Sequence, residues 1–327
     1  QVQKYQQLPK AHIGMVKNAY TAGNTQLTKM ADKVNQLSGT FQILPDFLGS
    51  DQPRTYALMA MTTSEERSSG GLIGSVGVVT TDNGKINIGD FRSNGEYIPY
   101  GAGDPTEDEQ RIFQQWGPLN MSFDVRDLAV YPDTSRSAEG MRAIWQRTPW
   151  GSNTQLDGVL MVDPVFLQEL TKISGNVTIP DGTVLTGDNT AEFLLNKVYV
   201  DYPVSMQDAL FAQVAEQTVG SMFSNVDLTK LTKVAQLMGS MAEGRHFSMY
   251  AFDETAEKTI SDAGFTAQTP SSEENPQVGV YVTEQNPSKM GWYIHRTSKV
   301  ARSTCGNDGS QTYHVEYKMT NTLESSQ

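Results

Sequence analysis

The hydrophobic positions of the first 91 residues recur with two different periods. Residues 11–38 carry apolar side chains at mostly three- and four-residue steps among Gln, Asn, Lys and Thr, which indicates one or two amphipathic helices. Three shorter apolar runs, at 55–61, 72–80 and 85–91, have the length and composition of strands. Asp82-Asn83-Gly84 separates the last two runs, and Asn-Gly tolerates the positive φ of a tight turn. The pattern therefore predicts a helical start followed by a β-hairpin.

The rest of the chain interleaves helical and strand patterns. DGVLMVD (157–163) predicts a short buried strand, and Asp163-Pro164 starts a helix because proline is tolerated in a first helical turn. Further helices are predicted over 135–146, 205–223 and 227–242, the last with Asp227 as its N-cap. Three runs near the end, YVTEQ, GWYIHRTSKV and TYHVEYKMTNTL, predict antiparallel strands.

This alternation predicts an α/β protein, a layered α-β-α arrangement with a mixed central sheet. We expect an N-terminal helical extension over residues 1–49. A single α/β domain over 50–327 would follow, with antiparallel strands from about residue 278.

Composition narrows the classes of partner. The net charge of −12 disfavours nucleic acid, which needs a basic face. Cys305 is the sole cysteine, so an intramolecular disulfide and a thiolate metal cluster are excluded. No run of about 18 apolar residues is present. The start at Gln1 suggests that an N-terminal segment, and with it a membrane anchor, has been removed.

Several segments resemble a bacterial family known as domain of unknown function 4012. They are LPDFLGSDQPRTYALMAMTTSEERSSGGLIGSVGVVTTDNGKI, LDGVLMVDPVFLQEL, SGNVTIPDGTVLTGDN and NPSKMGWYIHR, so the resemblance spans most of 40–325. Its most specific part is Glu-x-Arg-x-x-Gly-Gly, from Glu65 to Gly71; Thr62 stands where the family usually has asparagine. The resemblance implies a protein of the extracellular face of the membrane or the cell wall of Gram-positive bacteria. It implies an N-terminal membrane helix absent from this chain, and no known activity.

The same segments distantly resemble the LytR-CpsA-Psr family. Its members transfer glycopolymers from a polyprenyl-pyrophosphate carrier to peptidoglycan outside the cell. The shared order is a strand, an acid and an arginine (Glu65, Arg67), a second strand and turn, and a third strand ending in an acid and an arginine (Asp90, Arg92). This chain departs from that pattern at DALFAQVAEQTVGSMFS, which lacks the arginines that complete the family's pyrophosphate site.

These resemblances imply a candidate phosphate site. Arginine binds phosphate oxygens with two parallel hydrogen bonds, so Arg67 and Arg92 would form a clamp if the hairpin brings them together. Glu65 or Asp90 would hold Mg²⁺, and Gly70 and Gly71 would let the backbone approach the ligand. The alternative is structural: a solvated ion-pair turn, with glycines for positive φ, and a surface Arg92.

Three further residues are candidates for ligand binding. Arg126 and Asp127 form either a pair facing the same cleft or a salt bridge in a loop, and Lys289 is either a cation of the cleft or a turn residue. The four histidines show no metal-type spacing, and a lone histidine is more often structural. The glycines 71, 74 and 77 fit no nucleotide-binding motif, so no nucleotide cofactor is expected.

Two functions remain open at this point. One is a cell-envelope protein that binds a phosphorylated or glycan ligand, with phosphotransfer from a polyprenyl-linked glycopolymer as its enzymatic form. The other is a non-catalytic extracellular interaction or scaffold module with a vestigial cleft. Bound phosphate or metal between Arg67 and Arg92 would favour the first.

Overall fold

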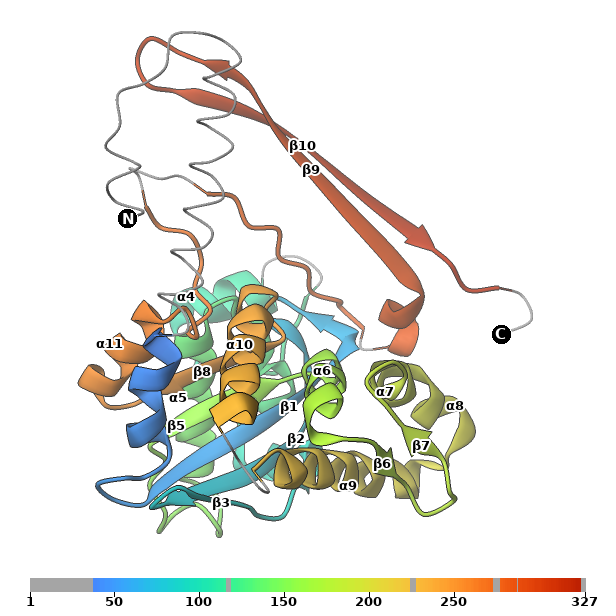
Figure 1. Cartoon of the computed structure of the whole chain (residues 1–327). Helices are drawn as coiled ribbons and strands as arrows, with labels where there is room; N and C mark the ends of the chain where they lie inside the picture. Colours follow the sequence, from blue (N-terminus) through green and yellow to red (C-terminus); the bar gives the residue numbers. More distant parts are fainter. Residues whose placement is uncertain (1–37, 116–118, 224–227, 273–276, 287, 325–327) are drawn as a thin grey trace, which may run out of the picture.

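The computed structural model of the chain describes residues 38–115, 119–223, 228–272, 277–286 and 288–324 (Figure 1). Residues 38–47 are helical; the rest of the helix predicted over 11–38, and the predicted N-cap Asp227, lie outside the described residues. Among the described residues, no helix combines the length and the apolar character needed to span a membrane.

The central sheet is mixed, as predicted. Its strand order is β3-β2-β1-β5-β8, and β4 pairs with β2 at the side of β3. β1 and β5 are parallel, whereas the other neighbours are antiparallel. The strands are β1 (Arg54–Arg67), β2 (Gly70–Asp82), β3 (Lys85–Ile88), β4 (Arg92–Ser93), β5 (Gly158–Val162) and β8 (Phe247–Ala251).

The hairpin predicted at Asn-Gly is confirmed. Asp82 pairs with Lys85, so β2 and β3 are joined by a two-residue turn. Asn83 and Gly84 have φ of 48° and 80°, which is the left-handed conformation that this turn requires.

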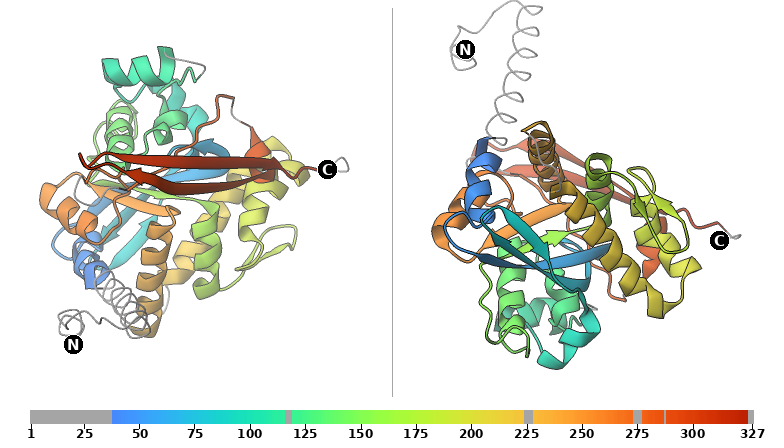
Figure 2. Two further views of the ribbon diagram at one scale, coloured as in Figure 1. Left: turned by 90° about the horizontal axis from the view of Figure 1, so that it is seen from above. Right: turned by 60° about the horizontal axis from the view of Figure 1, so that its bottom comes forward.

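Helices cover both faces of the sheet (Figures 1 and 2). The side chains of its strands alternate between two cores. Leu58 and Leu160 point to a core shared with α6 (Pro164–Ser174), α9 (Val204–Phe223) and α10 (Leu228–Glu243). Met59 and Met161 point to a core shared with η3 (Val125–Val130) and α5 (Thr134–Trp145). All five residues of β5 are buried because this strand is covered on both faces.

The remaining elements are mostly short. They are α3 (Asn94–Tyr97), η1 (Ile98–Tyr100), α4 (Glu107–Gln110), η2 (Arg111–Gln115), β6 (Val177–Thr178), β7 (Val184–Leu185), α7 (Thr190–Glu192), η4 (Phe193–Lys197), α8 (Val198–Asp201), α11 (Glu254–Asp262) and η5 (Lys289–Tyr293). Asp163 caps α6 because its Oδ1 accepts from the backbone N–H groups of Val165 and Phe166 at 2.9 and 3.0 Å.

The C-terminal strands form a separate two-stranded ribbon. β9 (Ile294–Cys305) pairs with β10 (Gln311–Asn321) in antiparallel register, and the ribbon stands away from the body (Figure 1). Two of the three predicted tail strands are thereby confirmed, but YVTEQ is not a strand, so that prediction was wrong. The sequence patterns also missed β8, which borders β5 in the main sheet.

Candidate functional site

The parallel strands β1 and β5 define one edge of the sheet where a site is expected. Their register runs from Tyr56 opposite Gly158 to Ala60 opposite Val162, so both carboxyl ends point to the same side. Open α/β sheets bind ligands beyond such ends. β1 continues past β5 to Arg67, and Asp163 follows β5 directly. Residues 62–70 and Asp163 therefore lie at this edge.

The glycine pair at this edge is required by the hairpin itself. The β1–β2 register shifts between Thr62 and Glu66, which brings the backbone of Gly71 close to β1. A Cβ on Gly71 would lie 2.1 Å from the carbonyl oxygen of Thr62, and Gly70 has a φ of 144°. Gly71 therefore makes a close approach, but to the backbone of Thr62 and Thr63, whereas the atoms nearest to Gly70 belong to the side chain of Met61.

Arg67 is buried and fully engaged with protein atoms. Its side chain is 1% exposed, and its Nε and Nη2 donate to Oδ1 of Asp127 at 3.0 and 2.8 Å. Its Nη1 donates to the carbonyl oxygens of Glu66 and Glu284. Burial alone would raise the pKa of Asp127, but hydrogen bonds from Ser122 and the charge of Arg67 outweigh it, so that pKa lies below its usual value. Arg67 and Asp127, both predicted site residues, therefore form a buried ion pair.

Arg92 lies elsewhere, on the core face that carries α5. It pairs with Val76 of β2, its guanidinium lies 4.3 Å from the centre of the Trp150 ring, and its Nη1 donates to Glu96 at 3.0 Å. Both contacts hold a partly exposed side chain at the protein surface.

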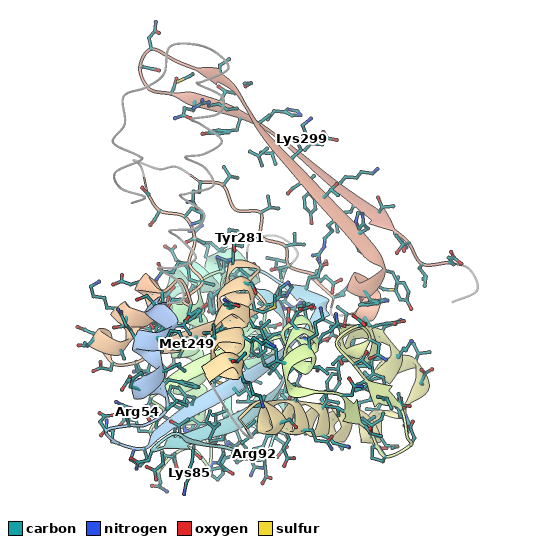
Figure 3. All side chains as sticks on the ribbon, viewed as in Figure 1. Arg54, Lys85, Arg92, Met249, Tyr281 and Lys299 are labelled. Atoms are coloured by element: carbon teal, nitrogen blue, oxygen red, sulfur yellow. The ribbon has the colours of Figure 1, made fainter. Side chains whose placement is uncertain are left out.

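The predicted clamp of Arg67 and Arg92 is not formed. Arg67 pairs with Gly70 and Arg92 with Val76, and six residues of β2 correspond to about 20 Å along a strand. Two arginine side chains cannot span that separation to share one phosphate. Figure 3 shows Arg92 at the end of the body opposite to Tyr281, whose ring lies 5.2 Å from the guanidinium of Arg245 near the carboxyl edge.

Glu65 and Asp90, either of which was predicted to hold Mg²⁺, are also far apart along the β1–β2–β3 strands. Asp90 is exposed and follows Gly89, which bonds to Val78, whereas Glu65 lies in the bulge opposite the start of β2. Glu65 is instead bound to a lysine. Within the described residues, no group of three or more His, Cys, Asp or Glu side chains is placed to hold a metal ion. This pair of carboxylates does not fit a shared metal ion.

Glu65 and Lys289 meet although 224 residues separate them in sequence. Lys289 Nζ donates to Glu65 Oε2 at 2.6 Å and lies 4.0 Å from the centre of the Tyr199 ring. Lys289 is one third exposed and Glu65 is largely buried. Lys289 also lines a cavity, to which neither Arg67 nor Arg92 contributes.

That cavity lies between the sheet and α6, α9 and α10, with a volume of about 360 Å³. Most of its walls are aliphatic or aromatic, including Leu58, Leu160, Phe166, Phe211 and Val234. The rest of the lining is polar or small. It consists at the carboxyl edge and at the surface of Glu65, Ser93, Asn94, Gly95, Asp163, Gln207, Asp208 and Lys289. Gly95 and Asp208 are exposed, so the cavity reaches solvent.

Arg126 and Asp127 do not pair with each other. Arg126 Nη2 binds Asp124 Oδ2 at 2.6 Å, and hydrogen bonding to Asp124 raises the pKa of Arg126. Neither lines the apolar cavity, whose walls come from other segments. For Arg126, this geometry favours the salt bridge in a loop.

A second, polar pocket of about 520 Å³ opens at the same edge. It contains His246, whose Nδ1 lies 2.7 Å from Oδ2 of Asp163, and Asp163 lines both pockets. The hydrogen bond to Asp163 raises the pKa of His246 above its usual value. The sequence patterns do not indicate a role for His246, because its partner lies 83 residues away and no local spacing signals such a pair.

The fold and site define an α/β protein with a mixed sheet and two pockets at the carboxyl edge of its parallel strands. Residues 51–199 match the sequence model of the family described as "Protein of unknown function (DUF4012)". The predicted resemblance to this family is confirmed over that range, which includes β1, β2 and α6. No curated protein matches the chain.

Two solved structures are similar over most of the chain. One is the transcriptional regulator yvhJ from Bacillus subtilis, at 12% identity and a TM-score of 0.29, covering 81% of this chain and 90% of that one. The other is the Lin1025 protein from Listeria innocua, at 8% identity and a TM-score of 0.32, covering 80% and 91%. Similarity at this level supports no statement about function.

Proposed function

We propose that this protein binds an isoprenoid phosphate, with the hydrocarbon chain in the apolar cavity and the phosphate beside Lys289. The observation that carries the proposal is the combination of a long apolar wall and a lysine at its polar rim. Such a site matches an amphiphile in both parts. The distant LytR-CpsA-Psr resemblance supports a polyprenyl chain, and with it a place at the cell envelope.

The hydrocarbon chain of the ligand is expected to contribute most of the binding free energy. Each buried methylene contributes about 0.8 kcal/mol, and the walls around Leu160, Phe166 and Phe211 offer no polar partner to compete. Affinity should therefore rise by at least about tenfold for each added five-carbon unit that enters the cavity.

The phosphate group of the ligand is expected to contribute less of the binding free energy. Lys289 already neutralises Glu65, so a phosphate would have to share or replace that partner. A charge-assisted hydrogen bond contributes about 1.5 to 3 kcal/mol before this competition is counted. Specificity for phosphate over alcohol is therefore expected to be modest.

The proposal concerns binding rather than phosphotransfer. Transfer requires cations around the phosphates. Here Arg67 is engaged with Asp127, Arg92 lies on the other face of the sheet, and α9 carries no arginine. A lipid-binding module without catalysis agrees best with these placements.

The direct test is calorimetric titration with geranyl phosphate, farnesyl phosphate and farnesol. We expect tighter binding of the farnesyl compound than of the geranyl one. Ala215→Trp, which fills the cavity from α9, should abolish binding, whereas Gln217→Trp on the exposed face of the same helix should not.

Lys289→Gln should weaken the binding of farnesyl phosphate by about fivefold and leave the affinity for farnesol unchanged. Lys299→Gln, on the ribbon, makes the same change in net charge away from the cavity (Figure 3). Equal affinity of all three ligands, or full binding by a folded Ala215→Trp variant, would refute the proposal.

A further inference from the structure

The polar pocket has walls from segments that are far apart in sequence. They include the β1–β2 turn with its flanks (63–70), Asp163, Leu195, the turn before β8 (Gly244–His246), Val280 and Val282, η5 with the start of β9, and Tyr317 of β10. Residues 244–246 and 280–317 lie outside the range matched by the family model. The pocket is therefore built largely by the C-terminal third of this chain.

The charges around this pocket nearly cancel. Arg67 is paired with Asp127, Arg296 with Glu66, and His246 with Asp163. Arg245 is the remaining cation of the lining, and its guanidinium donates to two backbone carbonyl groups. A polyanion would find few free donors here, so the pocket favours an uncharged, polar ligand.

Two aromatic rings at the pocket remain open to solvent. Trp292 and Tyr317 are 37% and 38% exposed, and both line the pocket. An aromatic face packs on the C–H groups of a pyranose ring, and the hydroxyl groups of the sugar need hydrogen-bonding partners around it. The lining supplies such groups at Thr63, Thr297 and Ser298, whereas the hydroxyl groups of Ser64, Ser68 and Ser69 already hydrogen-bond to Thr62, Thr283 and the carbonyl oxygen of Ala129.

His246 offers a fixed hydrogen-bonding group. Asp163, 1% exposed at its side chain, holds Nδ1 at 2.7 Å and is itself fixed as the N-cap of α6. Within the described part of the chain, Nε2 has no hydrogen-bonding partner, and the side chain is one third exposed. When the ring is neutral and Nδ1 carries the proton, Nε2 accepts a hydrogen bond; when it is protonated, Nε2 donates one. A sugar hydroxyl group can pair with Nε2 in both protonation states, because it can donate and accept a hydrogen bond.

We propose that the polar pocket binds a neutral saccharide, with a pyranose ring against Trp292 and Tyr317 and a hydroxyl group at Nε2 of His246. This goes beyond lipid binding, because it assigns a second ligand of another class to a separate pocket. The two pockets share Asp163 in their walls, so the saccharide and the lipid phosphate would lie at the same edge of the sheet.

The test uses the whole chain and two neutral tetrasaccharides, cellotetraose and fully N-acetylated chitotetraose. Saturation-transfer NMR on the unmodified protein, together with the change in tryptophan fluorescence, should detect saturable binding of at least one of them. Trp292→Ala and His246→Gln should each weaken that binding by about fivefold or more. Tyr313→Ala and His314→Gln are matched controls, because both residues are exposed on β10 and neither lines the pocket. The saccharide affinity of these two control variants should stay within twofold of that of the unmodified protein.

The outcomes separate this inference from the lipid proposal. Ala215→Trp should abolish farnesyl phosphate binding and leave saccharide binding intact. Absence of saturable binding of both tetrasaccharides would overturn the inference, as would binding that Trp292→Ala and His246→Gln leave unchanged. Tighter binding of inorganic phosphate than of either sugar would overturn it too, since that result would identify an anion site.

Discussion

Arg67 and Arg92 illustrate how the same residue type takes two structural roles within 25 positions. Arg67 follows a register shift that turns its side chain inward, where Asp127 and two carbonyl groups surround it. Arg92 lies on a two-residue edge strand, where an aromatic ring and a surface carboxylate hold it. The environments predict opposite consequences of substitution.

We predict that Arg67→Met destabilises the protein by about 3 to 5 kcal/mol, because it leaves the buried carboxylate of Asp127 unpaired. Arg92→Met should cost about 1 kcal/mol, since its ion pair is exposed. Urea unfolding measures both. The double variant Arg67→Met/Asp127→Asn should recover part of the loss, because neither charge is then buried. Equal losses for the two single variants would contradict this assignment.

His246 should make stability depend on pH. Its native pKa is raised by the hydrogen bond to Asp163, so the interaction stabilises fully below the unfolded value of about 6.5. This contribution declines as pH rises through the native pKa. The difference in unfolding free energy between wild type and His246→Gln should therefore shrink as pH rises from about 6 to 9. A difference that is constant over this range would show that the ion pair does not contribute.

At the scale of residues, the sequence identified the right segment but not the partners. Glu65, Arg67, Asp127 and Lys289 do meet other predicted residues, in the pairs Arg67–Asp127 and Glu65–Lys289. The pairing of Arg67 with Arg92 was wrong because their partners on β2, Gly70 and Val76, lie six residues apart, which is about 20 Å along a strand. No feature of the sequence signals the pair His246–Asp163, because tertiary structure alone brings the residues together.

At the scale of elements, local signals predicted most of the sheet. Asn83-Gly84 fixed the β2–β3 turn, and Asp163-Pro164 marked the start of α6. β8 was missed because it comes only four residues after the α10 helix, and five residues of strand give a weak periodic signal. YVTEQ has the composition of a strand, and the backbone N–H of Glu284 donates to the carbonyl oxygen of Glu66 in β1, but within the described residues this contact does not extend into a β-ladder.

The ribbon of β9 and β10 should be the least stable paired structure. All but the first of its residues are exposed, and two strands without a covering layer are marginally stable. Hydrogen exchange followed by mass spectrometry should show amides of β9 and β10 exchanging orders of magnitude faster than those of β1 and β5. Protection equal to that of β5 would show that another surface covers the ribbon in solution.

At the scale of the whole molecule, one edge of the sheet carries both candidate sites. The β1–β2 hairpin extends past β5, and its turn separates an apolar cavity beneath the helices from a polar pocket beneath the C-terminal segment. Composition alone cannot predict this division, since it depends on the sheet order and on where residues 280–286 and 288–298 pack against the body. Lipid binding should therefore depend on α9 and α10, and saccharide binding on residues beyond 240.

The most direct measurement is a crystal structure of the complex with farnesyl phosphate. We expect the hydrocarbon chain to lie between the sheet and α9, against Leu160 and Phe211, with a phosphate oxygen about 3 Å from Nζ of Lys289. A lipid bound at another surface, with the cavity closed by the protein's own side chains, would contradict this expectation.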